Sequence, residues 1–298
     1  MVKERGERLD RYLVRAGLAS SRRAAQELIA AGMVRVNGVR LRKAAIVASH
    51  DRIEIVRQVR AESIEPNQDL KIEILYADDA LIVANKPGLM PCHPLRAGER
   101  DTVMNAIVAR FPETAEIGDR RREGGLIHRL DNGTSGALLI ARTQPSFGLL
   151  RDALKAGKVA RTYEALVNGI LESPAELSSP IAHHPVNPRK MALGESQTQR
   201  RKRAGRPAVT RIEPIRRLGS VTLVRAIPLT GSRHQIRLHL ASAGFPIVGD
   251  SLYGAPPTKA LPEGRFWLHL REIELDSPAS AHIKVKAPVP TELARLIR

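Results

Sequence analysis

Short apolar runs that alternate with helical patterns dominate the chain from residue 71 to its end. The runs KIEIL (71–75) and ALIVA (80–84) have the length and composition of strands. Helices are expected at about 102–110, 145–156 and 233–243. No period of 20 to 50 residues repeats, so a repeat architecture is not indicated. Residues 71–298 are therefore predicted to form one mixed α+β domain.

The first sixty residues carry a separate pattern. Two short helices are expected, the first ending at Gly17 and the second opening at Ser20 or Ser21. Alternating valines then flank Asn37-Gly38, which is the strongest short hairpin signal. A last strand is expected near DRIEIV (51–56). These elements predict a small domain that folds around its own core.

The segment between the two patterns, RQVRAESIEPNQDL (57–70), lacks apolar periodicity and contains Pro66. Such a composition is typical of a linker. The predicted organisation is a small domain over residues 1–60, a linker over 61–70 and a large domain over 71–298.

Positive charge is concentrated in two stretches of this chain of 298 residues, whose formal net charge is +17. Residues 1–60 hold fourteen Lys and Arg against six Asp and Glu, and residues 189–217 hold ten against two. Two basic surfaces on a nearly neutral body favour contact with a polyanion, and nucleic acid is the expected partner. The alternative is that each stretch is a solvated face or an exposed loop.

A single cysteine, Cys92, excludes an intramolecular disulfide and a zinc site built from several thiolates. His234 and His239 are five positions apart on an expected helix, which puts their rings on different faces, so no metal site is expected. The N-terminus has no apolar signal core and no run approaches ~20 apolar residues, so a cytoplasmic protein is expected.

The segment GGLIHRLDNGTSGALLIART (124–143) places a polar turn between two apolar runs. Asp131 lies in this turn, near Arg129, Thr134 and Ser135, whose charge and hydroxyl groups would favour its ionised form. An ionised carboxylate in that place could act as a nucleophile or as a base. The alternative is a turn residue that caps its own backbone.

Five ordered motifs resemble those of the RluA-type pseudouridine synthases. The first is H-R-L-D-N-G-T-S-G (128–136), which matches the signature H-R-L-D-x-x-T-S-G. The other four are ALIVANKPGLMPCHP (80–94), ARTYEALVNG (160–169), LTGSRHQIRLHLASAGFPIVGDSLYG (229–254) and FWLHLREIEL (266–275) followed by APVP. This resemblance covers about residues 71–298 and implies an α+β fold with a mixed, largely antiparallel sheet.

The resemblance implies that Asp131 is the catalytic nucleophile and attacks a flipped uridine at the ribose anomeric carbon or at the uracil ring. Neither a metal nor an organic cofactor is implied. Tyr163 would offer an aromatic face to the uracil. Arg129 would contact the RNA backbone or help place the flipped nucleotide, and Thr134 is assigned to the same substrate site.

The basic partner of Asp131 is less directly implied, because the family pattern T-G-R-x-H-Q reads T-G-S-R-H-Q in this chain. Ser232 stands where the family has arginine, and the arginine is displaced by one position to Arg233. The reach of an arginine could absorb that shift, and its forked guanidinium suits a carboxylate. Arg233 is therefore predicted to pair with Asp131.

The small domain resembles the S-four RNA-binding domain over nearly all of residues 8–55, with His50 where the family often has glycine. Arg22 and Arg23, at a helix N-terminus, would meet phosphates. The residues expected to bind RNA are Arg8, Arg11, Arg22, Arg23, Arg35 and Lys43.

These observations favour a monomeric RNA pseudouridine synthase that acts on structured RNA, with large-subunit ribosomal RNA as the expected substrate. A tRNA-specific synthase and a non-catalytic RNA-binding or ribosome-assembly factor remain as alternatives. A metal-dependent nuclease is disfavoured, because no cluster of carboxylates accompanies Asp131 in the sequence.

Overall fold

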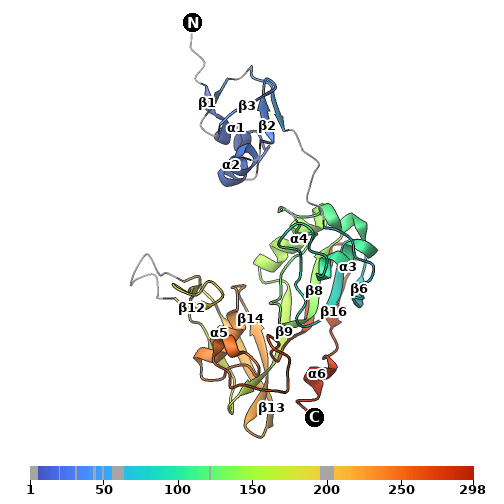
Figure 1. The fold of residues 1–298 in the computed structure, drawn as a ribbon, viewed down its shortest axis with the longest axis vertical. Helices are drawn as coiled ribbons and strands as arrows, with labels where there is room; N and C mark the ends of the chain where they lie inside the picture. The colour runs from blue at the N-terminus through green and yellow to red at the C-terminus, as the bar shows by residue number, and fades with distance from the viewer. Residues whose placement is uncertain are drawn as a thin grey trace. The chain divides into compact units, whose positions relative to one another are not determined.

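The computed structural model describes residues 6–19, 21–30, 32–42, 45–48, 50–55, 64–120, 122–194 and 205–298. The chain divides into two compact units, Met1–Ala61 and Glu62–Arg298 (Figure 1). Within the described residues, no helix has the length and apolar character needed to cross a membrane.

In its described residues, the first unit contains two helices and two small sheets. Its helices are α1 (Leu9–Arg15) and α2 (Arg22–Ala30), close to the predicted positions. Strand β1 (Glu7–Arg8) pairs with β4 (Ile46–Val47), and β2 (Val34–Val36) lies between β3 (Val39–Arg40) and β5 (Ile53–Ile55). Asn37 and Gly38 have φ values of 52° and 81°, as a tight hairpin turn requires, so the predicted hairpin is confirmed. The core consists of Leu9, Leu13, Ala25, Ile29, Val34, Val36 and Val47.

Asp10 is the buried charge of this unit, with a fully inaccessible side chain. Its carboxylate accepts hydrogen bonds from Arg8 Nε (3.0 Å), Arg22 Nη2 (3.2 Å) and Gln26 Nε2 (3.0 Å). The hydrogen bond from Arg8, followed by that from Gln26, lowers the pKa of Asp10 well below its ordinary value. Asp10 therefore joins α1 to α2 and fixes two of the arginines expected to meet RNA.

The lowered pKa of Asp10 predicts a stability that depends on pH. A carboxyl whose pKa is depressed on folding stabilises the folded state above the unfolded pKa, here 3.8, and this stabilisation is lost as pH falls below it. We expect Asp10→Asn to lower the urea midpoint of the first unit at pH 7, and the difference between the two midpoints to shrink as the pH falls below 3.8 toward the lowered pKa of the folded state. Methyl NMR signals of Leu9 and Leu13 report this transition, and a difference that is constant with pH would contradict the prediction.

A nine-stranded mixed sheet forms the framework of the second unit, within the residues that the structure describes. Among these strands, β8 and β15 run parallel and every other pair is antiparallel, which confirms the predicted α+β class. The strands, in spatial order, are β10 (Ala175–Leu177), β13 (Thr210–Leu218), β14 (Val221–Pro228), β9 (Ala160–Asn168), β15 (Leu268–Asp276), β8 (Ser135–Ala141), β7 (Leu81–Lys86) and β6 (Ile74–Ala77), with β16 (His282–Lys286) on β15.

Helices accompany both halves of this sheet (Figure 1). Near β6 to β8 lie α3 (Val103–Arg110) and α4 (Gln144–Lys155), and near β13 and β14 lies α5 (Gln235–Ser242). These three helices agree with the predicted segments to within two residues. The remaining elements are η1 (Pro112–Glu116), the hairpin β11 (Ile181–His183) and β12 (Met191–Leu193), η2 (Ser251–Tyr253) and α6 (Thr291–Ala294).

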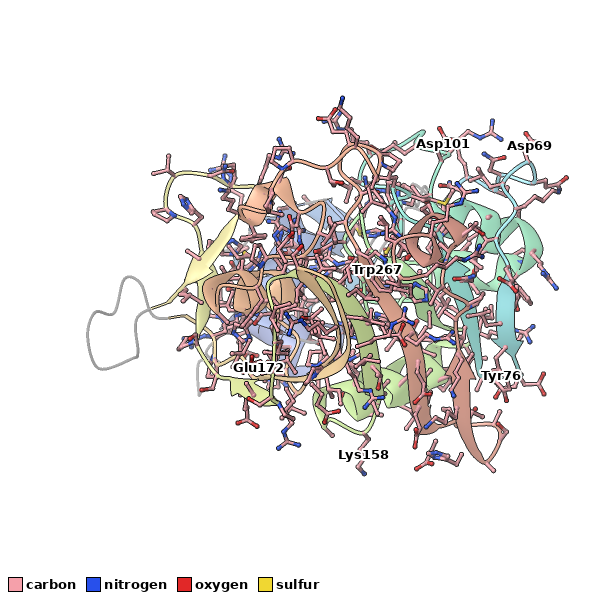
Figure 2. The ribbon with its side chains drawn as sticks, turned by 90° about the horizontal axis from the view of Figure 1, so that it is seen from below. Asp69, Tyr76, Asp101, Lys158, Glu172 and Trp267 are labelled. Atoms are coloured by element: carbon pink, nitrogen blue, oxygen red, sulfur yellow. The ribbon has the colours of Figure 1, made fainter. Side chains whose placement is uncertain are left out.

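The core of the second unit is continuous across the sheet, and Trp267 is fully buried within it (Figure 2). Residues 64–70, which the sequence predicted as part of a linker, belong to this unit. Ile64 is buried in the core, and the Asn105 side chain on α3 donates a hydrogen bond of 2.6 Å to the carbonyl of Glu65. The prediction failed here because this segment contributes one apolar anchor and backbone acceptors, which produce no periodicity.

Candidate active site

Asp131 lies in the loop that leads into β8, and two glycines shape this loop. A Cβ atom at Gly133 would lie 2.3 Å from the carbonyl oxygen of Gly264. At Gly136, where φ is 120°, a Cβ would lie 2.2 Å from the carbonyl oxygen of Leu270. The glycines of H-R-L-D-N-G-T-S-G are therefore needed for a close approach of the loop and of β8 to neighbouring backbone.

Lys86, at the end of β7, holds the backbone after Asp131. Its buried ammonium donates to the carbonyls of Pro87 (2.9 Å), Asn132 (3.1 Å) and Thr134 (2.6 Å). Burial lowers the pKa of Lys86 to about 8. The motif ALIVANKPGLMPCHP (80–94) contains this lysine in an N-K-P turn but does not indicate its role, because its three acceptors are carbonyls and every residue has a carbonyl.

Arg237 on α5 is the cation that meets Asp131. Its Nη1 atom donates a hydrogen bond of 2.9 Å to Asp131 Oδ2, while Nε and Nη2 bind both oxygens of Asp250 at 2.7 and 2.8 Å. The guanidinium lies 4.2 Å from the ring centroid of Phe266, within cation–π range. Burial opposes its charge, but the hydrogen bond to Asp250 and the charges of both carboxylates raise the pKa of Arg237 above its ordinary value.

The arrangement leaves Asp131 available to a substrate. Its side chain is 26% exposed, whereas those of Arg237 and Asp250 are 6% and 2% exposed. Asp250 thus fixes the guanidinium from the interior, and Arg237 directs one carboxylate oxygen of Asp131 without covering the whole group. A fixed charge pair with one reachable oxygen is the geometry that a carboxylate nucleophile needs.

The predicted pairing of Arg233 with Asp131 is wrong. Arg233 is exposed, and its guanidinium donates to the carbonyls of Pro188 (3.2 Å) and Arg189 (3.3 Å), in the connection between β11 and β12. The physical reason is that Arg233 precedes α5, whereas Arg237 lies within this helix. The helix residues from Gln235 to Leu240 are all buried, so Arg237 faces the interior where Asp250 lies. The segment TGSRHQIR (230–237) contains a second arginine, Arg237, and this is the signal in the sequence that could have found the pairing.

His234, which lies between Arg233 and Arg237 in the sequence, also faces Asp131. It adopts the left-handed conformation, with φ 54°, and its Nε2 lies 3.7 Å from Asp131 Oδ1. Its Nδ1 shares a hydrogen bond of 2.9 Å with the hydroxyl of Tyr253. Burial lowers the pKa of His234 to about 4, so the ring is neutral at pH 7 and can serve as a polar neighbour of Asp131 without a charge.

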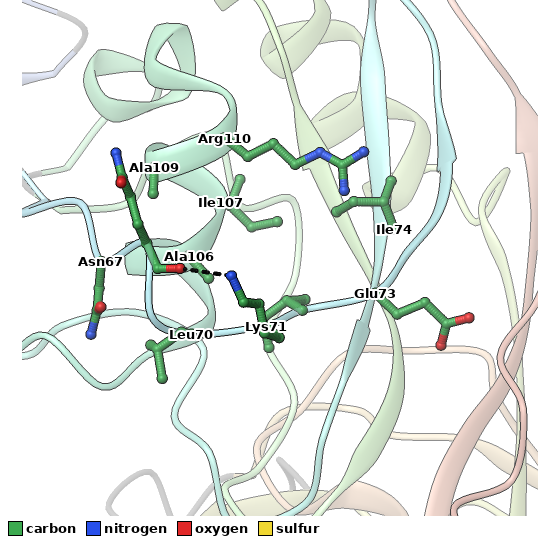
Figure 3. A pocket seen from close by; sticks show the side chains of 11 residues that line it. Asn67, Leu70, Lys71, Glu73, Ile74, Ala106, Ile107, Ala109 and Arg110 are labelled. Atoms are coloured by element: carbon green, nitrogen blue, oxygen red, sulfur yellow. Dashed lines mark hydrogen bonds between the residues drawn. The ribbon is translucent and has the colours of Figure 1, made fainter.

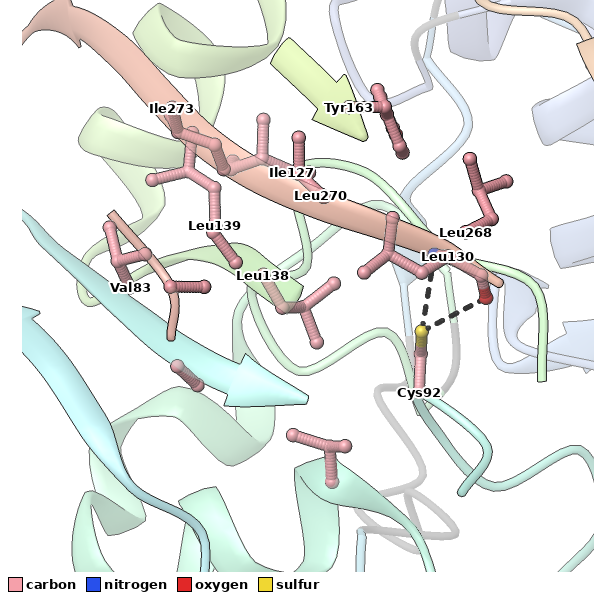
Figure 4. Packing of buried hydrophobic residues seen from close by; sticks show 14 of the residues in the cluster. Val83, Cys92, Ile127, Leu130, Leu138, Leu139, Tyr163, Leu268, Leu270 and Ile273 are labelled. Carbon is pink, nitrogen blue, oxygen red and sulfur yellow. Dashed lines mark hydrogen bonds between the residues drawn. The ribbon is translucent and has the colours of Figure 1, made fainter. Parts of the chain in front are cut away.

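The other predicted substrate residues have different surroundings. Tyr163 on β9 is 7% exposed and packs in the core near Leu130 and Leu268 (Figure 4), and burial raises its pKa to about 12. Arg129 is exposed beside the Asp131 loop. Thr134 is buried, and its N–H donates to the carbonyl of Asp131 at 3.0 Å, so the structure gives it a positioning role in place of the predicted substrate contact.

Cys92 also belongs to the support of this loop. Its thiol donates to the carbonyl of Leu130 and accepts from the Leu130 N–H, both at 3.3 Å (Figure 4). The neighbouring residue on one side of Asp131 is thereby fixed by a buried thiol, and those on the other side by Lys86. Cys92 is 5% exposed, so this support lies in the interior.

Comparison with known protein families decides the identity of this arrangement. The family model described as RNA pseudouridylate synthase matches residues 80–242, which include Asp131, Tyr163 and Arg237. The chain belongs to the RNA pseudouridylate synthase family. It is accordingly an isomerase that acts on RNA, and the prediction made from the motifs is confirmed.

Relatives of this synthase cover almost its whole length. A ribosomal large subunit pseudouridine synthase D of Pseudomonas aeruginosa is 32% identical over 98% of this chain and 91% of its own. An uncharacterized RNA pseudouridine synthase of Synechocystis is 33% identical over 98% of this chain and 88% of its own. The solved structure of Human RNA Pseudouridylate Synthase Domain Containing 1 is 27% identical, with a TM-score of 0.60 over 78% of this chain and 90% of that one.

The first unit of the synthase matches the S4 domain model over residues 7–53, which confirms the second resemblance. Of the arginines expected to meet RNA there, Arg11, Arg22 and Arg23 are exposed, and Arg23 pairs with Glu27 while its side chain is 91% exposed. Arg8 and Arg22 are fixed by Asp10, and Arg35 is half-buried on β2. Lys43 lies outside the described residues.

A groove of about 630 Å³ lies between α3 and the segment 67–74 that leads into β6 (Figure 3). Apolar side chains line it together with Asn67, Gln68, Lys71, Glu73 and Arg110, and Asp131 is not among the lining residues. Among the described residues, no three His, Cys, Asp or Glu side chains gather closely enough to hold a metal ion.

Proposed function

We propose that this synthase isomerises uridine in large-subunit ribosomal RNA, with Asp131 as the nucleophile. The observation that carries the proposal is the Asp131–Arg237 hydrogen bond of 2.9 Å, made by a partly exposed carboxylate on a loop that is held on both sides. The substrate class is supported by relatives such as the ribosomal large subunit synthase D of Pseudomonas aeruginosa.

The proposed reaction is balanced without a co-reactant. The Asp131 carboxylate adds to the ribose anomeric carbon or to the uracil ring, and the bond between N1 and the anomeric carbon breaks. The uracil then rotates, its carbon 5 forms a bond to the anomeric carbon, and the bond between Asp131 and the substrate breaks, which frees the carboxylate. Carbon 5 loses its proton as N1 gains one. We propose that no metal, organic cofactor or second subunit takes part, and that the reaction occurs in the cytoplasm.

The neighbouring side chains support proposed roles in binding the flipped nucleotide. Arg129, exposed beside the loop, contacts the RNA backbone or helps place the flipped nucleotide. Tyr163 offers the uracil the remaining exposed part of a ring that the core holds in place. The basic side chains of the S4 domain bind phosphates and position the RNA without reading its sequence.

Mapping pseudouridine in total RNA from cells with and without this gene tests the proposal. We expect specific uridines of large-subunit ribosomal RNA to lose modification in the null strain and to remain unmodified when it carries Asp131→Ala. Loss at tRNA positions would redirect the substrate assignment. An unchanged map would instead favour a binding or assembly role for the chain.

Salt dependence of RNA binding tests the proposed role of the S4 domain. Each phosphate contact that is lost should reduce the slope of log K against log salt by about 0.7 to 0.9. We expect the double variant Arg11→Gln/Arg23→Gln to lower the slope by up to about 2, and deletion of residues 1–60 to lower it further. The control is Lys155→Gln/Arg225→Gln, at two exposed cations that pair with Asp152 and Glu213 in the second unit and lie outside both basic stretches. An equal slope in all proteins would refute the role.

A further inference from the structure

Arg265 is a buried cation behind the Asp131 loop, and neither the motifs nor the proposed reaction gives it a function. Its side chain is only 2% exposed. The guanidinium donates to the carbonyl of Gly133 through Nη1 and to the hydroxyl of Ser135 through Nη2, at 2.9 Å in the latter case. Nη1 also donates to the carbonyl of Phe266 at 2.7 Å.

Arg265 and Lys86 together hold three successive peptide units after Asp131. Lys86 binds the carbonyls of Asn132 and Thr134, and Arg265 binds the carbonyl of Gly133 between them. Adjacent carbonyls of an irregular loop point in different directions, so a single cation cannot reach all three. The two cations, which bind alternate carbonyls of the loop, together fix its path and with it the direction of the Asp131 side chain.

The surrounding chain leaves space for this guanidinium. A Cβ atom at Gly88 would lie 2.4 Å from Arg265 Nε, so the glycine after the N-K-P turn makes room for the side chain. The next residue along the chain, Phe266, places its ring against the guanidinium of Arg237. Residues 265 and 266 therefore act on the two members of the catalytic pair, one on the loop of Asp131 and one on its cationic partner.

Glu292 on α6 is the counter-ion of Arg265. Its Oε1 atom lies 3.3 Å from Nη2 and 3.4 Å from Nε, and its side chain is 42% exposed. Burial lowers the pKa of Arg265, and the charge of Glu292 acts in the opposite direction. The same helix accepts a hydrogen bond of 2.8 Å from Trp267 Nε1 at the carbonyl of Leu293. The C-terminal helix is thus connected to the active-site loop through a buried charge.

We propose that Arg265, with Glu292 as its counter-ion, is a positioning residue for the isomerisation and fixes the loop so that Asp131 faces both Arg237 and the flipped uridine. This inference rests on the proposed function of Asp131. The predicted consequence is a loss in the rate of the chemical step at saturating RNA, with little change in RNA affinity, because Arg265 has no surface through which it could touch RNA.

The test compares Glu292→Gln with Glu213→Gln. Glu213 is a matched control, since its side chain is 44% exposed and pairs with an arginine, Arg225, on the far strands β13 and β14. Single-turnover rates are measured on a large-subunit RNA fragment that contains a mapped uridine, together with the RNA dissociation constant. We expect Glu292→Gln to lower the rate about three- to tenfold with affinity within twofold, and Glu213→Gln to leave both unchanged.

Two further variants, Arg265→Lys and Arg265→Met, change the cation of the Arg265–Glu292 pair. Lysine retains the charge but cannot reach Gly133 and Ser135 together, so the rate of Arg265→Lys should fall between those of the wild type and of Arg265→Met. A displaced nucleophile can lower the rate by up to about 100-fold. Rates are compared per folded molecule, well below the melting temperature of each variant. Glu292→Gln keeps the test decisive if the Arg265 variants do not fold.

Hydrogen exchange at the amides of residues 132–135 gives a readout that does not depend on activity. Faster exchange in Glu292→Gln than in Glu213→Gln, together with the loss of rate, supports the proposal. Faster amide exchange in Glu292→Gln with an unchanged single-turnover rate would overturn the proposal, and so would a lower melting temperature with no change in rate. Either result would leave Arg265 a purely structural residue. If the wild type converts no uridine of the fragment, the proposed function fails first, and the positioning role falls with it.

Discussion

Asp131→Asn is expected to abolish isomerisation while leaving the RNA dissociation constant within several-fold of the wild-type value. The amide keeps the shape of the side chain and can still accept a hydrogen bond from Arg237, but it has no anionic oxygen to attack carbon. Because the proposed role of Asp131 is that of the nucleophile and its side chain offers little binding surface, the loss should lie in the rate of the chemical step. Single-turnover conversion of the mapped uridine and a filter-binding titration measure the two quantities separately.

The control for this variant is Asp152→Asn, which removes an exposed carboxylate that pairs with Lys155 on α4. It should leave both rate and affinity unchanged, because surface ion pairs contribute little. Equal losses of binding and of turnover in Asp131→Asn would argue against the nucleophile assignment. Such a result would mean that Asp131 organises the RNA-binding surface and that another group performs the chemistry.

Arg237→Lys is expected to lower the single-turnover rate about 10²- to 10³-fold, as is typical when a fixed electrostatic contact to a reacting group is removed. Arginine binds Asp131 with one nitrogen and Asp250 with two others, and a lysine ammonium cannot reproduce this fork. Asp250, whose side chain is 2% exposed, would lose a bidentate partner in the interior. Removal of one partner of a buried pair typically destabilises a protein by about 3 to 5 kcal/mol, so a lower melting temperature is also expected.

Arg233→Lys provides the matched comparison, four positions earlier in the sequence. It alters only the contact with the carbonyls of Pro188 and Arg189, so its rate should stay within a few-fold of the wild-type rate. The same two variants therefore decide between the pairing expected from the sequence and the pairing in the structure. A large loss of rate in Arg233→Lys, with a small one in Arg237→Lys, would restore the original assignment.

Local patterns were sufficient for most of the secondary structure. The helices at α3, α4 and α5, the hairpin at Asn37-Gly38 and the mixed sheet all agree with the predictions, because apolar spacing and turn chemistry act over a few residues. Residues 64–70 were misassigned because their attachment depends on long-range contacts, such as that of Glu65 with Asn105.

In the active site, too, local features follow from the sequence and long-range contacts do not. The sequence by itself determined the family, the loop that carries Asp131 and the glycines that this loop needs, since each of these is written in the identity and spacing of neighbouring residues. Only the tertiary structure decided that Arg237 meets Asp131, that Asp250 holds Arg237, and that Lys86 and Arg265 fix the loop from two sides. The physical reason is that these contacts join groups 13 to 132 residues apart, several of them through backbone carbonyls. A carbonyl has the same chemistry in every residue, so only its position in space reveals which cation it binds.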